Sequence, residues 1–130
     1  MSFVRLYSGS DGESHFEDID MGFTSVDMSP IGSFSPAVSR APVHIVPEKV
    51  RAVVVGSQTE ENAQEFHPTR GRHYLITLSG MGELEVGSGE VRRFGPGDWL
   101  IDGDETGRGH KARVVEAPWQ WCAILLERSD

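Results

Sequence analysis

The second half of the chain is a series of short β-prone segments separated by glycine turns. The segments have four to eight residues, with frequent β-branched and aromatic side chains, and eight of the chain's 15 glycines separate them. They span residues 73–79, 82–87, 90–94, 98–101, 110–115 and 119–126. Strands of this length, repeated every 8–12 residues or so with turn signals between them, are typical of a β-sandwich or β-barrel.

The first half has weaker strand signals. Residues 43–46 and 49–55 have strand-like composition, whereas residues 20–42 are rich in proline, glycine and serine. No part of the chain has the 3.6-residue apolar period of an amphipathic helix, so helix content should be very low. We therefore predict one all-β domain over residues 43–130, preceded by an N-terminal extension or arm over residues 1–42.

Composition restricts the partners and the location. Twenty acidic and 12 basic side chains give a net charge of −8, which argues against nucleic acid as the main partner because phosphate binding needs a basic face. No apolar run approaches the roughly 20 residues that span a bilayer. Cys122 is the only cysteine, which excludes an intrachain disulfide, and no signal peptide is visible. A cytoplasmic protein without a membrane partner is expected.

Three of the five histidines, His67, His73 and His110, lie in or beside the strands of the glycine-rich half. Side chains alternate between the two faces of a strand. Lys111 and Arg113 should face water, so His110 should point into the interior. Imidazoles that converge inside a small barrel are a plausible metal site. His15 and His44 fit no such pattern.

The stretch from His67 to Val115 resembles the cupin superfamily, whose members are small jelly-roll β-barrels with two metal-binding motifs. In the first motif, His67 stands at the first histidine position, Thr69 at the second and His73 at the glutamate position, ahead of Gly80. The second motif has a Gly-Asp turn followed by a histidine. Here Gly97-Asp98 is similar to that turn, and the segment from Asp104 to His110 supplies the histidine.

The resemblance implies a cupin-type jelly-roll barrel with a divalent metal, but two ligand positions differ. Thr69 is a poor ligand, and His73 replaces a carboxylate. The implied set is His67, His73 and His110, which suits Fe(II), Zn, Ni or Cu. Asp104 is a candidate ligand or a partner that orients an imidazole, with capping of the nearby turn as its structural alternative.

Two further residues are candidates for supporting roles. Tyr74 follows His73 and should point to the opposite face of its strand. Glu83 could reach the mouth of a barrel and act as a base, or it could belong to a solvated hairpin. The short Gly-x-Gly units precede no helix, so neither a dinucleotide site nor a P-loop is indicated, and no hydrolase motif surrounds a serine or Cys122.

Two functions remain open. The first is a small metal-dependent enzyme, of oxygenase, isomerase, cyclase or lyase type, that acts on a small organic molecule. The second is a non-catalytic ligand-binding or sensor module with a degenerate metal site, which Thr69 favours. The resemblance also implies a homodimer, in which residues 1–42 would pack on the partner, because a segment without its own core must lie on another surface.

Overall fold

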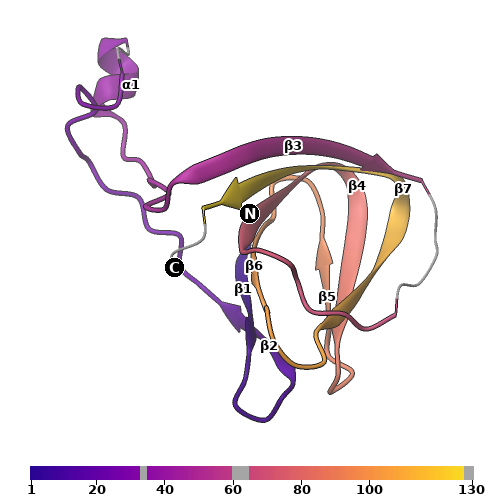
Figure 1. Ribbon diagram of the computed structural model, residues 1–130. Coiled ribbons are helices and arrows are strands. Elements are labelled where there is room, and N and C mark those ends of the chain that lie inside the picture. The colour runs from indigo at the N-terminus through magenta and orange to yellow at the C-terminus, as the bar shows by residue number, and fades with distance from the viewer. Residues whose placement is uncertain (33–34, 60–64, 128–130) are drawn as a thin grey trace.

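The computed structural model describes residues 1–32, 35–59 and 65–127. Seven strands form one mixed sheet in the order β2-β1-β6-β4-β7-β3, and β5 pairs with β4 (Figure 1). The strands are β1 (Phe3–Ser8), β2 (Ser14–Asp18), β3 (Val50–Gln58), β4 (His73–Val86), β5 (Val91–Phe94), β6 (Trp99–Gly103) and β7 (His110–Leu126). Within the described ranges the only helix is α1 (Pro36–Arg40).

The prediction of an all-β fold with very little helix is confirmed. The jelly-roll barrel is not confirmed, because the sheet is not closed: β2 and β3 are the two ends of the strand order, and no ladder joins them in the described part of the chain. No helix among the described residues is long and apolar enough to cross a membrane.

Residues 3–8 and 14–18 belong to the sheet. β1 runs parallel to β6, from Phe3 opposite Trp99 to Tyr7 opposite Gly103, and antiparallel to β2. Val4 and Leu6 of β1 are almost fully buried. The prediction of an arm over residues 1–42 is therefore wrong for these residues, because alternating apolar side chains give β1 an inner face that packs in the core.

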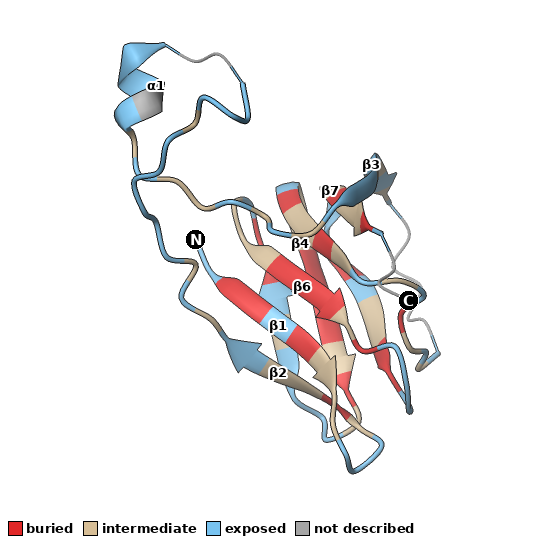
Figure 2. Ribbon diagram, turned by 60° about the vertical axis from the view of Figure 1, so that its left-hand side comes forward, coloured by how far each residue is buried: buried red, intermediate tan, exposed pale blue. Residues whose placement is uncertain are grey.

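A segment outside the sheet begins after β2. Ile19, Met21 and Val46 pack against the sheet, and Thr24 pairs with Val43 in an isolated bridge. Between them the chain extends away from the sheet and carries α1 (Figure 1), whose described residues are exposed (Figure 2). Residues 19–46 thus contain the arm-like part of the predicted extension.

β4 and β7 form the longest ladder of the sheet. They pair antiparallel from His73 opposite Leu125 to Val86 opposite His110. Three register shifts interrupt the ladder between Thr77 and Gly82. Gly80 lies among them with φ +72°, and a side chain there would collide with the backbone oxygens of Pro118 and Glu116. These irregularities allow both strands to bend, as bulges do, so that the sheet curls around its inner face (Figure 1).

Apolar side chains pack on both faces of the curled sheet. The inner cluster contains Val4, Leu6, Leu84, Val86, Phe94, Leu100, Val114 and Trp119. The outer cluster contains Phe3, Tyr74, Ile101 and Leu126, and the start and end of the arm-like segment cover part of it. Figure 2 shows the resulting buried stripe along β1, β6 and β4. Both clusters take their members from neighbouring strands because side chains alternate between the faces.

We predict that Gly80→Ala destabilises the fold by more than about 3 kcal/mol, because it adds a collision to the strain of a left-handed backbone. Gly89→Ala is the matched control: Gly89 has φ +91° but open space around the added methyl group. It should cost only about 1–2 kcal/mol. Urea unfolding measures both values, and equal costs would contradict the close approach at Gly80.

Candidate functional site

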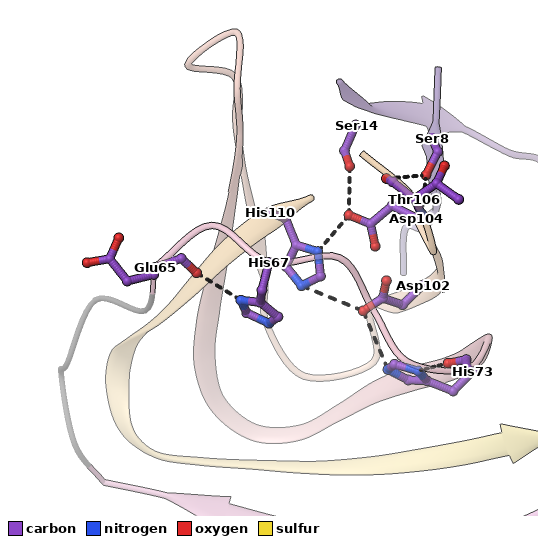
Figure 3. Close-up of polar contacts among 10 residues, drawn as sticks. Ser8, Ser14, Glu65, His67, His73, Asp102, Asp104, Thr106 and His110 are labelled. Atoms are coloured by element: carbon purple, nitrogen blue, oxygen red, sulfur yellow. Dashed lines mark hydrogen bonds and ion pairs between the residues drawn. The ribbon is translucent and has the colours of Figure 1, made fainter. Parts of the chain in front are cut away.

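Two histidines and one aspartate converge on the wall of a cavity that opens to solvent. His73 Nε2 lies 3.5 Å from Asp102 Oδ2, and His110 Nε2 lies 3.8 Å from the same oxygen (Figure 3). All three side chains line the cavity. The side chains of Asp102 and His110 are each 7% exposed, and that of His73 is 18% exposed. The site is thus a largely buried polar cluster.

The curl of the sheet brings these residues together. His73 begins β4 and His110 begins β7, so they lie at opposite ends of the antiparallel ladder. Asp102 pairs directly with His73 in the ladder between β6 and β4. Asp102 also shares the inner face of β6 with Leu100, two residues before it, because side chains alternate. His110 lies near Asp102 only because the β4–β7 ladder is bent, which brings its far end close to the end that contains His73.

Asp104 fixes the orientation of His110. Its Oδ2 lies 2.7 Å from His110 Nδ1 and accepts a hydrogen bond of 2.7 Å from the hydroxyl of Ser14. Asp104 and Ser14 are fully buried. Since the carboxylate accepts, His110 Nδ1 carries a proton, and in the neutral ring a lone pair is then left on Nε2. The expected role of Asp104 as a partner that orients an imidazole matches these contacts.

The other two histidines have the same tautomer. His73 Nδ1 lies 3.0 Å from the carbonyl oxygen of Gly71, and His67 Nδ1 lies 2.8 Å from that of Glu65. A carbonyl oxygen only accepts, so each Nδ1 must donate. In their neutral forms His67, His73 and His110 therefore all have Nε2 available as a ligand or proton acceptor, as metal-binding histidines do when their other nitrogen is held.

Burial and neighbouring groups shift the pKa values of Asp102 and Asp104 in opposite directions. Burial, reinforced by the neighbouring Asp104, raises the pKa of Asp102 well above its usual value. Burial also opposes ionisation of Asp104, but hydrogen bonds, above all that from His110, outweigh it and lower the pKa of Asp104. Burial lowers the pKa of His73, helped by the proximity of His110. Asp104 is thus the ionised carboxylate, and the site favours neutral His73.

His67 lies beside the cluster rather than inside the cavity. Its backbone pairs with that of His110, with N···O distances of 2.9 and 3.0 Å, and the two rings are 4.9 Å apart. Gly109 permits this approach: it has φ +81°, and a side chain there would overlap the backbone of His67. His67 is exposed. Thr69, at a usual cupin ligand position, is buried, and its N–H donates to the Asp104 carbonyl oxygen.

The structure does not bring Tyr74 or Glu83 to the cluster. Tyr74 is buried in the outer cluster, and its hydroxyl donates to Glu48. Glu83 accepts hydrogen bonds from Arg93 and Arg113. The predicted supporting roles of Tyr74 and Glu83 are not supported. Tyr74 lies on the sheet face opposite His73, and Glu83 forms ion pairs with two arginines.

A metal ion could be held by residues of this cluster. Asp102, Asp104 and His110 each offer a ligand atom, and the three atoms lie within 4.8 Å of one another. Asp102 Oδ1 and Asp104 Oδ1 are buried without a hydrogen-bond partner in the described part of the chain. Among the described residues, the expected set His67, His73 and His110 is not brought together this closely. The group instead pairs His110 with Asp104, which was a candidate ligand, and with Asp102, which was not.

The cavity next to the cluster has a volume of about 310 Å³ and mainly apolar walls. Side chains from β3, β4, β6 and β7 form it. The apolar residues are Val54, Leu75, Leu84, Leu100, Ala112, Trp119, Trp121, Ala123 and Leu125. A mainly apolar cavity with a few convergent polar groups is the usual form of a small-molecule site.

Sequence reasoning missed Asp102 and Ser14. The predicted strand ended at Ile101, so Asp102 was assigned to the following polar loop. The alternation of Trp99, Leu100, Ile101 and Asp102 contained the signal, because Leu100 and Asp102 must share a face if the strand continues. No local signal marks Ser14, whose contact with Asp104 joins residues 90 positions apart.

We predict that Asp102→Asn makes the metal-free protein more stable than the wild type as pH rises above about 4. A carboxyl group whose pKa is higher in the folded state contributes stability below its unfolded pKa, near 3.9, and this stability is lost as pH rises through the folded pKa. Asparagine does not titrate, so the difference should grow with pH and then level off. Urea unfolding in EDTA across the pH range measures it.

Asp98→Asn is a control of opposite sign. Burial opposes ionisation of Asp98, but N–H groups of Ser2 and Gly95, each 2.9 Å from a carboxylate oxygen, outweigh it and lower its pKa. Asp98 therefore stabilises above its unfolded pKa, and Asp98→Asn should be less stable than wild type at neutral pH. Asp102→Asn behaving in the same way would contradict the unfavourable burial of Asp102.

Comparison with protein families and curated proteins identified no relative. No family model matches the chain, and no curated protein matches it. The functional conclusions therefore depend on the geometry of the cluster, on the cavity beside it and on the motifs in the sequence.

Proposed function

We propose that the protein is a small metal-dependent enzyme of the cupin type that acts on a small organic molecule. A divalent transition metal, Fe(II), Zn, Ni or Cu, would be held by Asp102 and His110, two members of the close group, with His73 beside Asp102 as a further ligand. The substrate would enter the adjoining cavity. The jelly-roll family, the enzyme activity and the cytoplasmic location remain predictions from the sequence, as does the lack of a nucleic-acid or membrane partner.

The observation that carries this proposal is the convergence of three potential ligand atoms, His73 Nε2, His110 Nε2 and Asp102 Oδ2. The Nδ1 atoms of both histidines are bonded to acceptors, so in the neutral rings both Nε2 atoms present lone pairs to Asp102 Oδ2. The distances of 3.5 and 3.8 Å exceed those of ordinary hydrogen bonds. Lone pairs of three groups are mutually repulsive unless a cation, or a proton on one of the groups, lies among them.

One of the separations also suits two ligands of one ion. Two ligands about 2.1 Å from a tetrahedral metal lie about 3.4 Å apart, close to the distance between His73 Nε2 and Asp102 Oδ2. Two imidazoles and one carboxylate are a donor set that first-row transition metals accept. Asp104 would then act through His110, since its oxygen holds Nδ1. His67 is the remaining candidate ligand, because its ring lies beside that of His110.

A bound metal would supply Lewis acidity toward a carbonyl or carboxylate oxygen, or a site for activating O₂. The protein itself would do the rest. Asp104 and Ser14 keep the proton on His110 Nδ1 and fix its ring. The apolar cavity walls exclude water and orient the substrate toward the cluster.

The second candidate is a ligand-binding or sensor module without catalysis. Two observations favour it: Thr69 occupies a usual ligand position, and His67 is exposed outside the cavity. A protonated Asp102 would replace the cation in this case, since burial raises its pKa. Metal binding therefore separates the two functions.

We predict that metal-free protein takes up one equivalent of Zn²⁺, Ni²⁺ or anaerobic Fe²⁺. A metal at 100 times its Kd adds about 2.7 kcal/mol to the free energy of unfolding, and thermal shift together with elemental analysis detects it. His110→Ala and the isosteric Asp102→Asn should abolish uptake. His44→Ala is the control, because His44 packs on Phe3 of the outer cluster.

The absence of stoichiometric metal in the wild type would refute the enzyme proposal in favour of the binding module. Unchanged uptake in folded Asp102→Asn would show that the metal binds elsewhere. Circular dichroism confirms that each variant is folded before its metal content is compared.

We also propose a homodimer formed through the outer face of β3, β4 and β7. Val53, Val55 and Leu78 are 61%, 68% and 52% exposed. Val55 lies opposite Cys122, which lies opposite Ile76, so this face is apolar across three strands. Strands that are apolar on both faces are normally covered on both. A second copy would cover this face and meet the exposed apolar side chains of the arm-like segment.

We predict that Val55→Asp converts a wild-type dimer to a monomer, because a carboxylate at the centre of an apolar interface loses its hydration. Val91→Asp is the control, since Val91 is 39% exposed on β5 and should leave the dimer intact. Light scattering after size exclusion measures the mass. A monomeric wild type at micromolar concentration would contradict the dimer.

A further inference from the structure

We infer that the cavity binds a molecule with an apolar, preferably aromatic, body and a single oxygen-bearing headgroup. The headgroup would meet the cluster of His73, Asp102 and His110, and this part of the inference depends on the proposed function. The apolar body is argued from the cavity walls alone. The inference separates this class from sugars, sugar acids and nucleotides, which are also small organic molecules.

The walls offer almost no group that could pair with a polar substrate. Leucine and alanine side chains of β4, β6 and β7 form most of the surface, including Leu75, Leu100, Ala112 and Leu125. Among the described residues that line the cavity, the titratable side chains are His73, Asp102 and His110. Charge is thus confined to the cluster, and Gln58, the polar side chain elsewhere on the wall, already accepts a hydrogen bond from Trp121.

The polar atoms of the two tryptophans are already used within the protein. Trp119 Nε1 donates to the hydroxyl of Thr77 at 3.1 Å, and Trp121 Nε1 donates to the side-chain oxygen of Gln58 at 2.7 Å. Their rings therefore present carbon surface to the cavity. Flat aromatic surfaces attract an aromatic ring by stacked or edge-to-face contacts.

A polyhydroxylated body would be penalised in this environment. Each hydroxyl group that leaves water without a partner costs about 1–3 kcal/mol, and the apolar walls would leave several unpaired. An apolar ring gains free energy at the same place through the loss of its hydrated surface. The polar cluster at one end can satisfy one headgroup.

The size of the cavity restricts the molecule further. A volume of about 310 Å³ is at the lower end of the range for small-molecule sites. It suits a body of one or two rings and is too small for a dinucleotide or a folded peptide segment. Val54, from edge strand β3, lies on the wall and is 41% exposed, so it lies where the cavity meets solvent.

The test uses two neutral probes, cinnamyl alcohol and glucose, titrated by calorimetry into full-length protein with and without Zn²⁺. Cinnamyl alcohol has one hydroxyl group on an aromatic body, whereas glucose is polar throughout. We expect cinnamyl alcohol to bind and glucose to give no heat above dilution. Val54→Trp should fill the cavity and lower the affinity for cinnamyl alcohol at least about tenfold.

Val91→Trp is the matched control. It adds the same side chain at a 39% exposed position of β5 that does not line the cavity, and should leave the affinity within about twofold of wild type. If glucose binds as well as cinnamyl alcohol, or if both variants bind alike, the inference is overturned. Zinc titration without a probe tests the proposed function separately. If cinnamyl alcohol binds but the protein takes up no metal, the proposed metal enzyme is refuted and the inference of an apolar ligand is supported. If the protein takes up metal but does not bind cinnamyl alcohol, the inference is refuted and the proposed metal site is supported.

Discussion

The site depends on the bend of the β4–β7 ladder. His73 and His110 are at opposite ends of this ladder, and 13 residues of extended strand would separate its ends by roughly 40 Å if it were flat. Both imidazoles nevertheless lie beside the same oxygen of Asp102. The register shifts around Gly80 supply the curvature, and the curved inner face then encloses both the apolar core and the cavity. The cluster is therefore a consequence of how the sheet curls, although its residues come from separate strands.

The burial of Asp102 is unfavourable for stability but would be useful for binding a cation. Its side chain occupies an inner-face position that Leu100 and other neighbours fill with apolar groups, and burial makes its charge unfavourable. The favourable hydrogen bonds of the neighbourhood go instead to Asp104, which Ser14 and His110 satisfy. Such an arrangement has a physical explanation if a cation enters, because a positive charge among three lone pairs reverses the cost of burial. The apolar cavity strengthens this effect by keeping water away.

Much of the strand pattern could be predicted from the sequence, because glycine turns and β-branched segments are local signals. The inward direction of His110 also followed from local alternation, since Lys111 and Arg113 lie on the other face and pair with acidic side chains. β1 was missed as a strand because a parallel partner lies more than 90 residues away. Asp102 was missed because the predicted strand ended at Ile101, whereas β6 continues to Gly103. Tyr74 and Glu83 were considered only because they are near motif residues in the sequence.

The sequence alone determined the all-β class, the scarcity of helix and the three histidines that deserve testing, because each of these depends on neighbours within a few residues. It also contained the cupin-like motifs that suggested a metal. The tertiary structure decided which groups meet: Asp102 between two imidazoles, Asp104 behind His110, and His67 at the edge of the site. It also decided that the walls of the cavity are apolar and that both tryptophan N–H groups are already paired. These features depend on strand register and sheet curvature, which bring together residues that are distant in the chain, and no local pattern specifies either.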